Sequence, residues 1–229
     1  MAAGMAGSYT MLFQPDSGAG VPQGTGYATV AISAKGAVTM AGKLPNNIAV
    51  TQGSQLLGPG IWPLYVPLHT GKGFLMGNMA YVSQGPVSIH GFLDWGKPST
   101  SGAFHPAAFT VGVSAACARY TAPAAGRRAL DFLPTSPNAV FEASLGNLAG
   151  PVTKNITLDT ANKFIIPVDA NALKLTLASA TGLVTGSFKP TPTVTRTLTG
   201  IVFQGETFAT GFFVGDSESG NFNIETPAP

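Results

Sequence analysis

The fold of this chain is indicated most clearly by the stretch Gly73-Phe74-Leu75-Met76-Gly77-Asn78-Met79, in which glycines frame short apolar runs. The same pattern recurs in Gly182-Leu183-Val184-Thr185-Gly186-Ser187-Phe188. In both copies a second apolar segment with an internal glycine, Gly91 or Gly200, follows at the same distance along the chain. Equal spacing predicts a duplicated hairpin. Because glycine weakens a strand interior, its recurrence indicates a bend or close packing against another segment.

Alternating side chains extend this pattern over most of the sequence. In 28–32 (Ala-Thr-Val-Ala-Ile) and 173–177 (Leu-Lys-Leu-Thr-Leu) the larger apolar residues share one face, which is typical of antiparallel strands. At the usual strand length, such a chain holds roughly 12 to 16 strands. So many strands cannot remain one flat sheet with exposed edges. The sequence therefore predicts an all-β fold, an antiparallel meander that closes into a barrel or a barrel-like sandwich.

Composition shifts suggest where the folded part begins and ends. Residues 1–7 read as a flexible leader and residues 226–229 as a linker-like tail, which leaves open whether the chain is a domain cut from a longer protein. Between them we expect a single all-β domain, residues 8–225, with pseudo-repeated halves at about 8–97 and 104–225.

Charge and cysteine content exclude several classes of protein. Only 10% of the 229 residues are charged and the net charge is +2, which argues against a coiled coil and against nucleic acid as a partner. Cys117 is the only cysteine and sits among alanines, so it reads as a buried apolar residue. The three histidines have no metal-binding spacing. We therefore expect no metal site and no cofactor.

Five residues form the candidate ligand site: Trp62, Tyr65, His90, Asp94 and Trp95. Alternation places His90 and Asp94 on one face of a strand and Trp95 on the other. The polar pair is either a ligand site or a solvated outer face, and the second interpretation is preferred. Trp95 is predicted to lie in the core, whereas Trp62, between Gly60 and Pro63, is predicted to lie in an exposed loop.

No catalytic residue is predicted. The nucleophile signature Gly-x-Ser-x-Gly is absent. A glycosidase would need two carboxylates facing each other across a cleft, and Asp94 with Glu206 is the pair to examine first.

Eight short segments together resemble a family, an uncharacterised β-rich module found near the C-terminus of very large bacterial secreted or surface proteins. The segments are 7–10 (Gly-Ser-Tyr-Thr), 60–65 (Gly-Ile-Trp-Pro-Leu-Tyr), 73–77 (Gly-Phe-Leu-Met-Gly), 91–95 (Gly-Phe-Leu-Asp-Trp), 104–109 (Phe-His-Pro-Ala-Ala-Phe), 181–188 (Thr-Gly-Leu-Val-Thr-Gly-Ser-Phe), 200–204 (Gly-Ile-Val-Phe-Gln) and 211–215 (Gly-Phe-Phe-Val-Gly). The resemblance implies an extracellular or cell-surface location and contributes no catalytic motif.

Three functions remain open. The preferred hypothesis is a non-enzymatic extracellular module with a structural, adhesive or assembly role, whose partners are further copies of itself or flanking domains of a longer chain. Low charge favours it, because charged residues normally protect strand edges from pairing. The first alternative is a carbohydrate-binding or carbohydrate-active domain that recognises a glycan through the candidate site. The second is a membrane β-barrel, which is not favoured because no aromatic girdle is visible.

Overall fold

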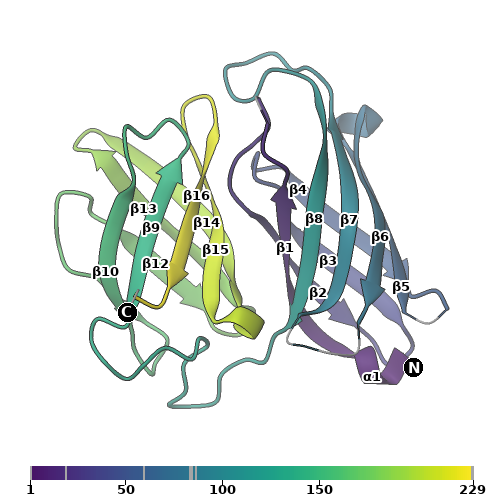
Figure 1. Ribbon diagram of the computed structural model, residues 1–229, viewed down its shortest axis with the longest axis horizontal. Helices are drawn as coiled ribbons and strands as arrows, with labels where there is room; N and C mark the ends of the chain where they lie inside the picture. The colour runs from purple at the N-terminus through teal and green to yellow at the C-terminus, as the bar shows by residue number, and fades with distance from the viewer. Residues whose placement is uncertain (1, 19, 59, 83–84, 86, 228–229) are drawn as a thin grey trace.

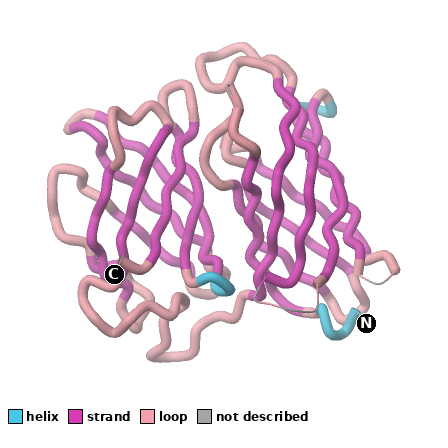
Figure 2. Tube along the Cα trace, viewed as in Figure 1, coloured by secondary structure: helices cyan, strands magenta, loops and turns pink. Residues whose placement is uncertain are grey.

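The computed structural model of the chain describes residues 2–18, 20–58, 60–82, 85 and 87–227. Within these ranges, sixteen strands form two antiparallel sheets of eight, and each sheet curls until it nearly closes into a barrel (Figure 1). Strand and loop dominate the trace, with helix limited to short segments (Figure 2). The all-β antiparallel meander that the sequence predicts is therefore confirmed, and the closed form is the barrel.

The first barrel uses the N-terminal half of the chain. Its strands are β1 (Gly7–Pro15), β2 (Gly26–Ile32), β3 (Ala37–Lys43), β4 (Ala49–Gln55), β5 (Ile61–Leu68), β6 (Gly73–Tyr81), β7 (Val87–Lys97) and β8 (Phe109–Arg119). The 3₁₀ helix η1 (His69–Gly71) joins β5 to β6. Consecutive strands pair within 1–4 and within 5–8, and β1 also pairs with β8. That last ladder joins the two halves of the meander and leaves β4 and β5 as the margins.

The second barrel has the same circular strand order, but its gap lies one strand earlier, between its third and fourth strands. Its strands are β9 (Ala139–Leu145), β10 (Val152–Leu158), β11 (Phe164–Ile165), β12 (Lys174–Ala178), β13 (Leu183–Thr191), β14 (Val194–Phe203), β15 (Phe208–Val214) and β16 (Ser219–Glu225). The 3₁₀ helix η2 (Gln204–Glu206) joins β14 to β15. Here β9 pairs with β16, and the margins are β11 and β12. The similarity of the two eight-stranded sheets supports the predicted internal duplication.

The boundary between the repeats differs from the predicted one. The sequence placed it between residues 97 and 104, but the strand β8 still belongs to the first barrel, because it pairs with both β7 and β1. The repeats therefore cover residues 7–119 and 139–225. The two similar hairpins, β6–β7 and β13–β14, are consequently one strand out of step within their barrels.

The predicted leader and tail are only partly described. Residues 1, 228 and 229 lie outside the described part of the chain. The leader was expected to be flexible, but α1 (Ala2–Met5) is helical and β1 already begins at Gly7. Met5 is buried, and its carbonyl accepts a hydrogen bond from the Tyr9 hydroxyl. Burial of Met5 attaches this segment to the first barrel.

Glycines let large rings fit inside the second barrel. Gly200 and Gly211 lie opposite each other on β14 and β15, and both face the interior. The Phe222 ring lies over this pair, since a Cβ added at either glycine would stand 2.6–2.7 Å from a ring carbon. Phe222 also stacks on Phe141, with ring centroids 6.0 Å apart. The close-packing role predicted for the recurring glycines is thus seen at Gly200.

Side chains, not a backbone ladder, bridge the open margin of the first barrel. The Trp62 indole Nε1 on β5 donates to Gln52 Oε1 on β4, at 3.0 Å. Gln52 Nε2 donates in turn to the carbonyl oxygen of Pro63, at 3.1 Å. Ser54 Oγ donates to the same carbonyl, at 3.1 Å. Proline has no N–H to offer a ladder, so its position on a marginal strand follows from its chemistry.

A loop spans the open margin of the second barrel. The loop 166–173 follows the two-residue strand β11. Its Asp169 forms an ion pair with Lys154 on β10, and its Asn171 donates through Nδ2 to the Lys189 carbonyl on β13, at 2.9 Å. These contacts attach the loop to the strands on both sides of the gap.

The two barrels pack side by side through the outer faces of β1, β2, β14 and β15 (Figure 1). Leu12 and Phe203 belong to the apolar cluster between them. Tyr27 stacks on Phe212 with centroids 6.3 Å apart, and its hydroxyl is 2.7 Å from Thr199 Oγ1. This contact between the barrels buries part of the outer faces of β1 and β2.

The glycine pair generates a stability prediction. We expect Gly211→Ala to lower the free energy of unfolding by about 1–3 kcal/mol, because the new methyl overlaps the Phe222 ring and the Thr199 carbonyl. Gly53→Ala on β4 is the matched control, since a Cβ there meets nothing within 4 Å. Urea unfolding of both variants measures the difference, and equal stabilities would contradict the packing role.

The margin of the first barrel generates a second prediction. We expect Gln52→Leu to cost about 1–3 kcal/mol, because it leaves the buried Trp62 N–H without its acceptor and removes one of the two donors to the Pro63 carbonyl. Gln55→Leu, on the exposed part of the same strand, should change stability by less than about 0.5 kcal/mol. Denaturant unfolding followed by tryptophan fluorescence tests the pair. An undiminished unfolding midpoint in the Gln52 variant would be incompatible with the bridge.

Candidate functional site

The two tryptophans of the predicted ligand site are both 0% exposed inside the first barrel. Trp95 packs edge-to-face on Phe109 with centroids 4.9 Å apart, so its predicted core position is confirmed. The prediction of an exposed loop at Trp62 is wrong. Gly60 and Pro63 suggested a turn, but the residue belongs to β5, and its polar N–H is satisfied by Gln52 across the margin. Neither ring is accessible to a ligand.

Tyr65 and Asp94 do share one outer face. The cross-strand register places Tyr65 opposite Met76 and Met76 opposite Asp94, so the three residues form a row across β5, β6 and β7. Phe92 lies two residues along β7 and faces the same way. Tyr65 is 58% exposed, Phe92 60% and Met76 40%. We call Tyr65, Met76 and Phe92 the β5–β7 patch.

Phe92 is exposed, but its ring packs against a neighbouring strand. A Cβ built on Gly112 of β8 would meet the Phe92 ring at 2.4 Å, so the ring lies against the bare backbone of the neighbouring strand. By alternation, Phe92 shares the face of β7 that carries His90 and Asp94. What the alternation could not reveal is that Met76 comes from another strand to complete an apolar surface.

His90 lies apart from the β5–β7 patch, in a cleft of about 350 Å³ between the barrels. Its Nε2 is 3.1 Å from the Val87 carbonyl. Glu206 of η2 lines the same cleft, together with Gln14 and Ser114. The carboxylate pair predicted from the sequence, Asp94 with Glu206, is therefore not assembled. Glu206 lines this cleft with His90, and Asp94 does not line it. Asp94 lies four residues along the strand from His90, about 13 Å in extended chain.

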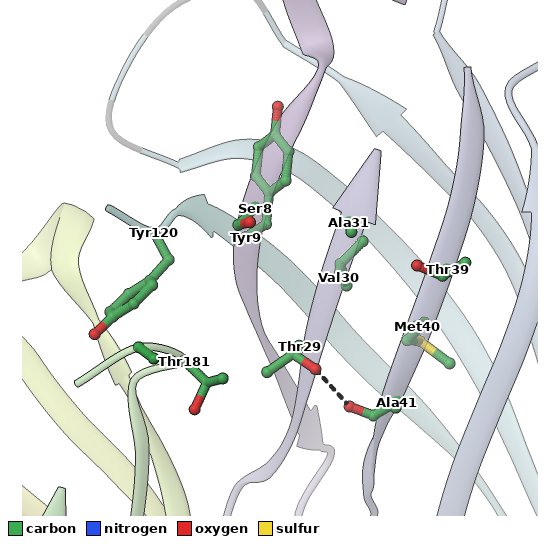
Figure 3. A pocket seen from close by; sticks show the side chains of 11 residues that line it. Ser8, Tyr9, Thr29, Val30, Ala31, Thr39, Met40, Ala41, Tyr120 and Thr181 are labelled. Carbon is green, nitrogen blue, oxygen red and sulfur yellow. Dashed lines mark hydrogen bonds between the residues drawn. The ribbon is translucent and has the colours of Figure 1, made fainter. Parts of the chain in front are cut away.

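A groove of about 200 Å³ lies on the other side of the barrel contact (Figure 3). Hydroxyl and methyl groups line it, and Thr29, Thr39 and Thr181 supply the polar atoms. Tyr120 closes one side and donates its hydroxyl to the Ser179 carbonyl at 2.5 Å. Burial raises the pKa of Tyr120 to about 12, so this phenol stays neutral. The groove therefore offers no group that exchanges a proton near neutral pH.

A pocket of about 710 Å³ lies at the open end of the second barrel. We call it the second-barrel mouth. Its charged and amide side chains are Asn147, Asn171, Arg196 and Asp216. Arg196 comes from β14, and Asp216 from the turn between β15 and β16. The sequence analysis did not select these residues. The sequence feature that could have identified this site is Arg196, a charged residue that shares the inward face of its strand with Val194 and Leu198.

Other chemistry is limited within the described residues. No group of three or more His, Cys, Asp or Glu side chains there could hold a metal ion. Cys117 is fully buried, as predicted, and burial raises its thiol pKa, which disfavours the reactive thiolate. No helix in the described ranges has both the length and the apolar character to cross a membrane.

Comparison with known proteins returned no match to any family, curated protein or solved structure.

His105 links the barrels and generates a pH prediction. It is buried in the loop after β7, and its Nε2 accepts a hydrogen bond from the Ser219 N–H on β16, at 3.0 Å. Burial lowers its pKa below the ordinary 6.5, with Lys97 acting in the same direction and Gly20 and Glu218 opposing it. The unfolded chain therefore binds the proton more readily, and stability should fall as the pH drops below 6.5.

The matched variants are His105→Gln and His90→Gln. A glutamine oxygen at 105 can accept the same hydrogen bond without titrating, so the loss of stability below pH 6.5 should shrink. Burial also lowers the pKa of His69, so some pH dependence should remain. The His90→Gln variant makes the same substitution at an exposed histidine and serves as the control. Thermal unfolding on both sides of pH 6.5 decides, and an unaltered profile in His105→Gln would refute the assignment.

Proposed function

We propose that this chain is a non-enzymatic contact module, a pair of barrels that associates with further copies of itself in a structural or adhesive assembly. The observation that carries the proposal is the β5–β7 patch. Adjacent exposed apolar side chains on one sheet face mark an interaction surface more often than scattered single ones do. The proposed setting is extracellular or at the cell surface, in keeping with the resemblance noted from the sequence.

The partner that fits this patch best is a second copy of the same chain. A two-fold axis through the patch would place Met76 near its own symmetry mate and each Tyr65 near the partner's opposite edge. Asp94 is the only charged side chain in the row of Tyr65, Met76 and Asp94, so little charge has to be desolvated. The low overall charge, 10% of residues, provides little electrostatic repulsion between copies.

The positions of the candidate acidic and basic side chains support the proposal that the module is not an enzyme. His90 and Glu206 line the cleft between the barrels, whereas Asp94 lies beside the β5–β7 patch. Acid–base catalysis needs its groups within hydrogen-bonding reach of one substrate. Separation of Asp94 from Glu206 removes the carboxylate pair that glycoside hydrolysis would need, which favours a contact role.

The test is the double variant Tyr65→Ser/Met76→Ser. We expect the wild-type average mass to rise above 23.3 kDa with concentration in sedimentation velocity. The double variant should weaken association by about tenfold or more, since large buried side chains dominate binding energy. Phe92 is left in place because it packs on Gly112.

The matched control is Leu133→Ser/Ile165→Ser, which removes two apolar side chains that are at least as exposed, from the second half of the chain. It should associate as the wild type does. A wild type that stays at its monomer mass at every concentration would refute the proposal. Equal association by both double variants would refute the β5–β7 patch as the contact.

A further inference from the structure

The second-barrel mouth lies where the connections at one end of that barrel meet. Its lining comes from the turn after β9, the loop 166–173, the β13–β14 hairpin and the turn that carries Asp216. At about 710 Å³ it is within the size range of small-molecule pockets. Mouths of β-barrels are recurrent ligand sites, because loops from several strands converge there.

A donor and an acceptor stand side by side in this mouth. Arg196 points inward from β14 and only 13% of its side chain is exposed. Its Nη2 donates to Asp216 Oδ2 at 2.6 Å. Asp216 is 75% exposed, so much of its carboxylate remains open to solvent. The Arg196 hydrogen bond lowers the pKa of Asp216, so the carboxylate stays ionised and accepts hydrogen bonds near neutral pH.

Neighbouring amides hold these groups in place. Asn147 Oδ1 accepts from the backbone N–H groups of Ser217 and Glu218, at 3.0 and 3.1 Å, and so fixes the turn that carries Asp216. On the other side, the Asn171 backbone N–H donates to Asp169 Oδ1 at 3.0 Å. The polar groups of the mouth are therefore preorganised, which lowers the entropic cost of binding.

The charge balance selects the kind of ligand. Arg196 is paired with Asp216, and Lys154 on the inward face of β10 is paired with Asp169. Of the two pairs, Arg196 with Asp216 lines the mouth, so an anionic ligand would have to break that pair, and a cationic ligand would meet an arginine. A neutral molecule with several hydroxyl groups needs neither, because each hydroxyl can donate to Asp216 and accept from an arginine or asparagine N–H.

We propose that the second-barrel mouth binds a neutral sugar of one or two rings through Arg196, Asp216 and Asn171. This site is distinct from the β5–β7 patch and does not rest on the proposed self-association. It also differs from the glycan site predicted from the sequence, whose two tryptophan rings are buried.

The experiment is a titration of the ¹⁵N-labelled full chain with maltose and with cellobiose, followed by amide chemical shifts. We expect one of the two disaccharides to shift the Asn147 and Asn171 signals to saturation. Asp216→Ala should weaken that binding by about tenfold or more, because a hydrogen bond to a charged group is lost. Asp216 is mostly exposed, so this variant should keep the fold.

The controls separate this site from others. Asp94→Ala removes an exposed carboxylate from the first barrel and should leave the affinity unchanged. Arg196→Gln, with folding checked by its amide spectrum, should abolish the shifts. Citrate serves as the anionic probe and should not shift the mouth signals. Absence of shifts with both disaccharides, persistence of shifts in Asp216→Ala, or shifts with citrate alone would each overturn the proposal.

Discussion

Pairing of the first strand with the eighth is the constraint on which each barrel depends. In the first barrel the ladder runs from Tyr9 opposite Arg119 to Pro15 opposite Val113, and in the second barrel β16 pairs with β9 in the same way. These strands are far apart along the chain, so closure carries a loop entropy cost that local hairpins avoid. Once the ladder forms, every strand gains an inner and an outer face, and all later features follow from that division.

Filling the interior is the second requirement, and the two barrels meet it differently. The first encloses two tryptophans among aliphatic side chains, and a side-chain bridge from Gln52 satisfies the Trp62 indole N–H at its margin. The second is filled by phenylalanines, which fit because glycines remove the side chain opposite. Phe222 over Gly200 and Gly211 is the clearest example. The glycines are thus required by ring packing as much as by curvature.

Alternation predicted which face of its strand a side chain occupies. It did not predict which strands lie next to one another. His90 and Trp95 were assigned to opposite faces from local sequence, because a side-chain period of two needs no partner to be recognised. Trp62 was misplaced because glycine and proline near it indicate a turn, while its stabilising partner Gln52 lies on the preceding strand. The predicted boundary between the repeats differs from the observed one for a related reason. The strand β8 pairs with β1, which is far away along the chain, and local sequence does not reveal that pairing. Arg196 carried a local signal, a charge within an apolar stripe, that only the closed barrel explains.

The corresponding ends of the two barrels show how a duplicated fold diverges. In the first barrel the inward Lys97 is buried, and its ammonium donates to the Pro98 and Ala107 carbonyls and to Thr100 Oγ1 of the following loop. The ammonium group of Lys97 is therefore hydrogen-bonded within the protein. In the second barrel the connection after the seventh strand is a short turn, and the inward cation Arg196 faces an open mouth where only an exposed carboxylate opposes it. A long connection therefore satisfies the inward Lys97 at one end, whereas a short turn leaves the inward Arg196 beside an open mouth at the other.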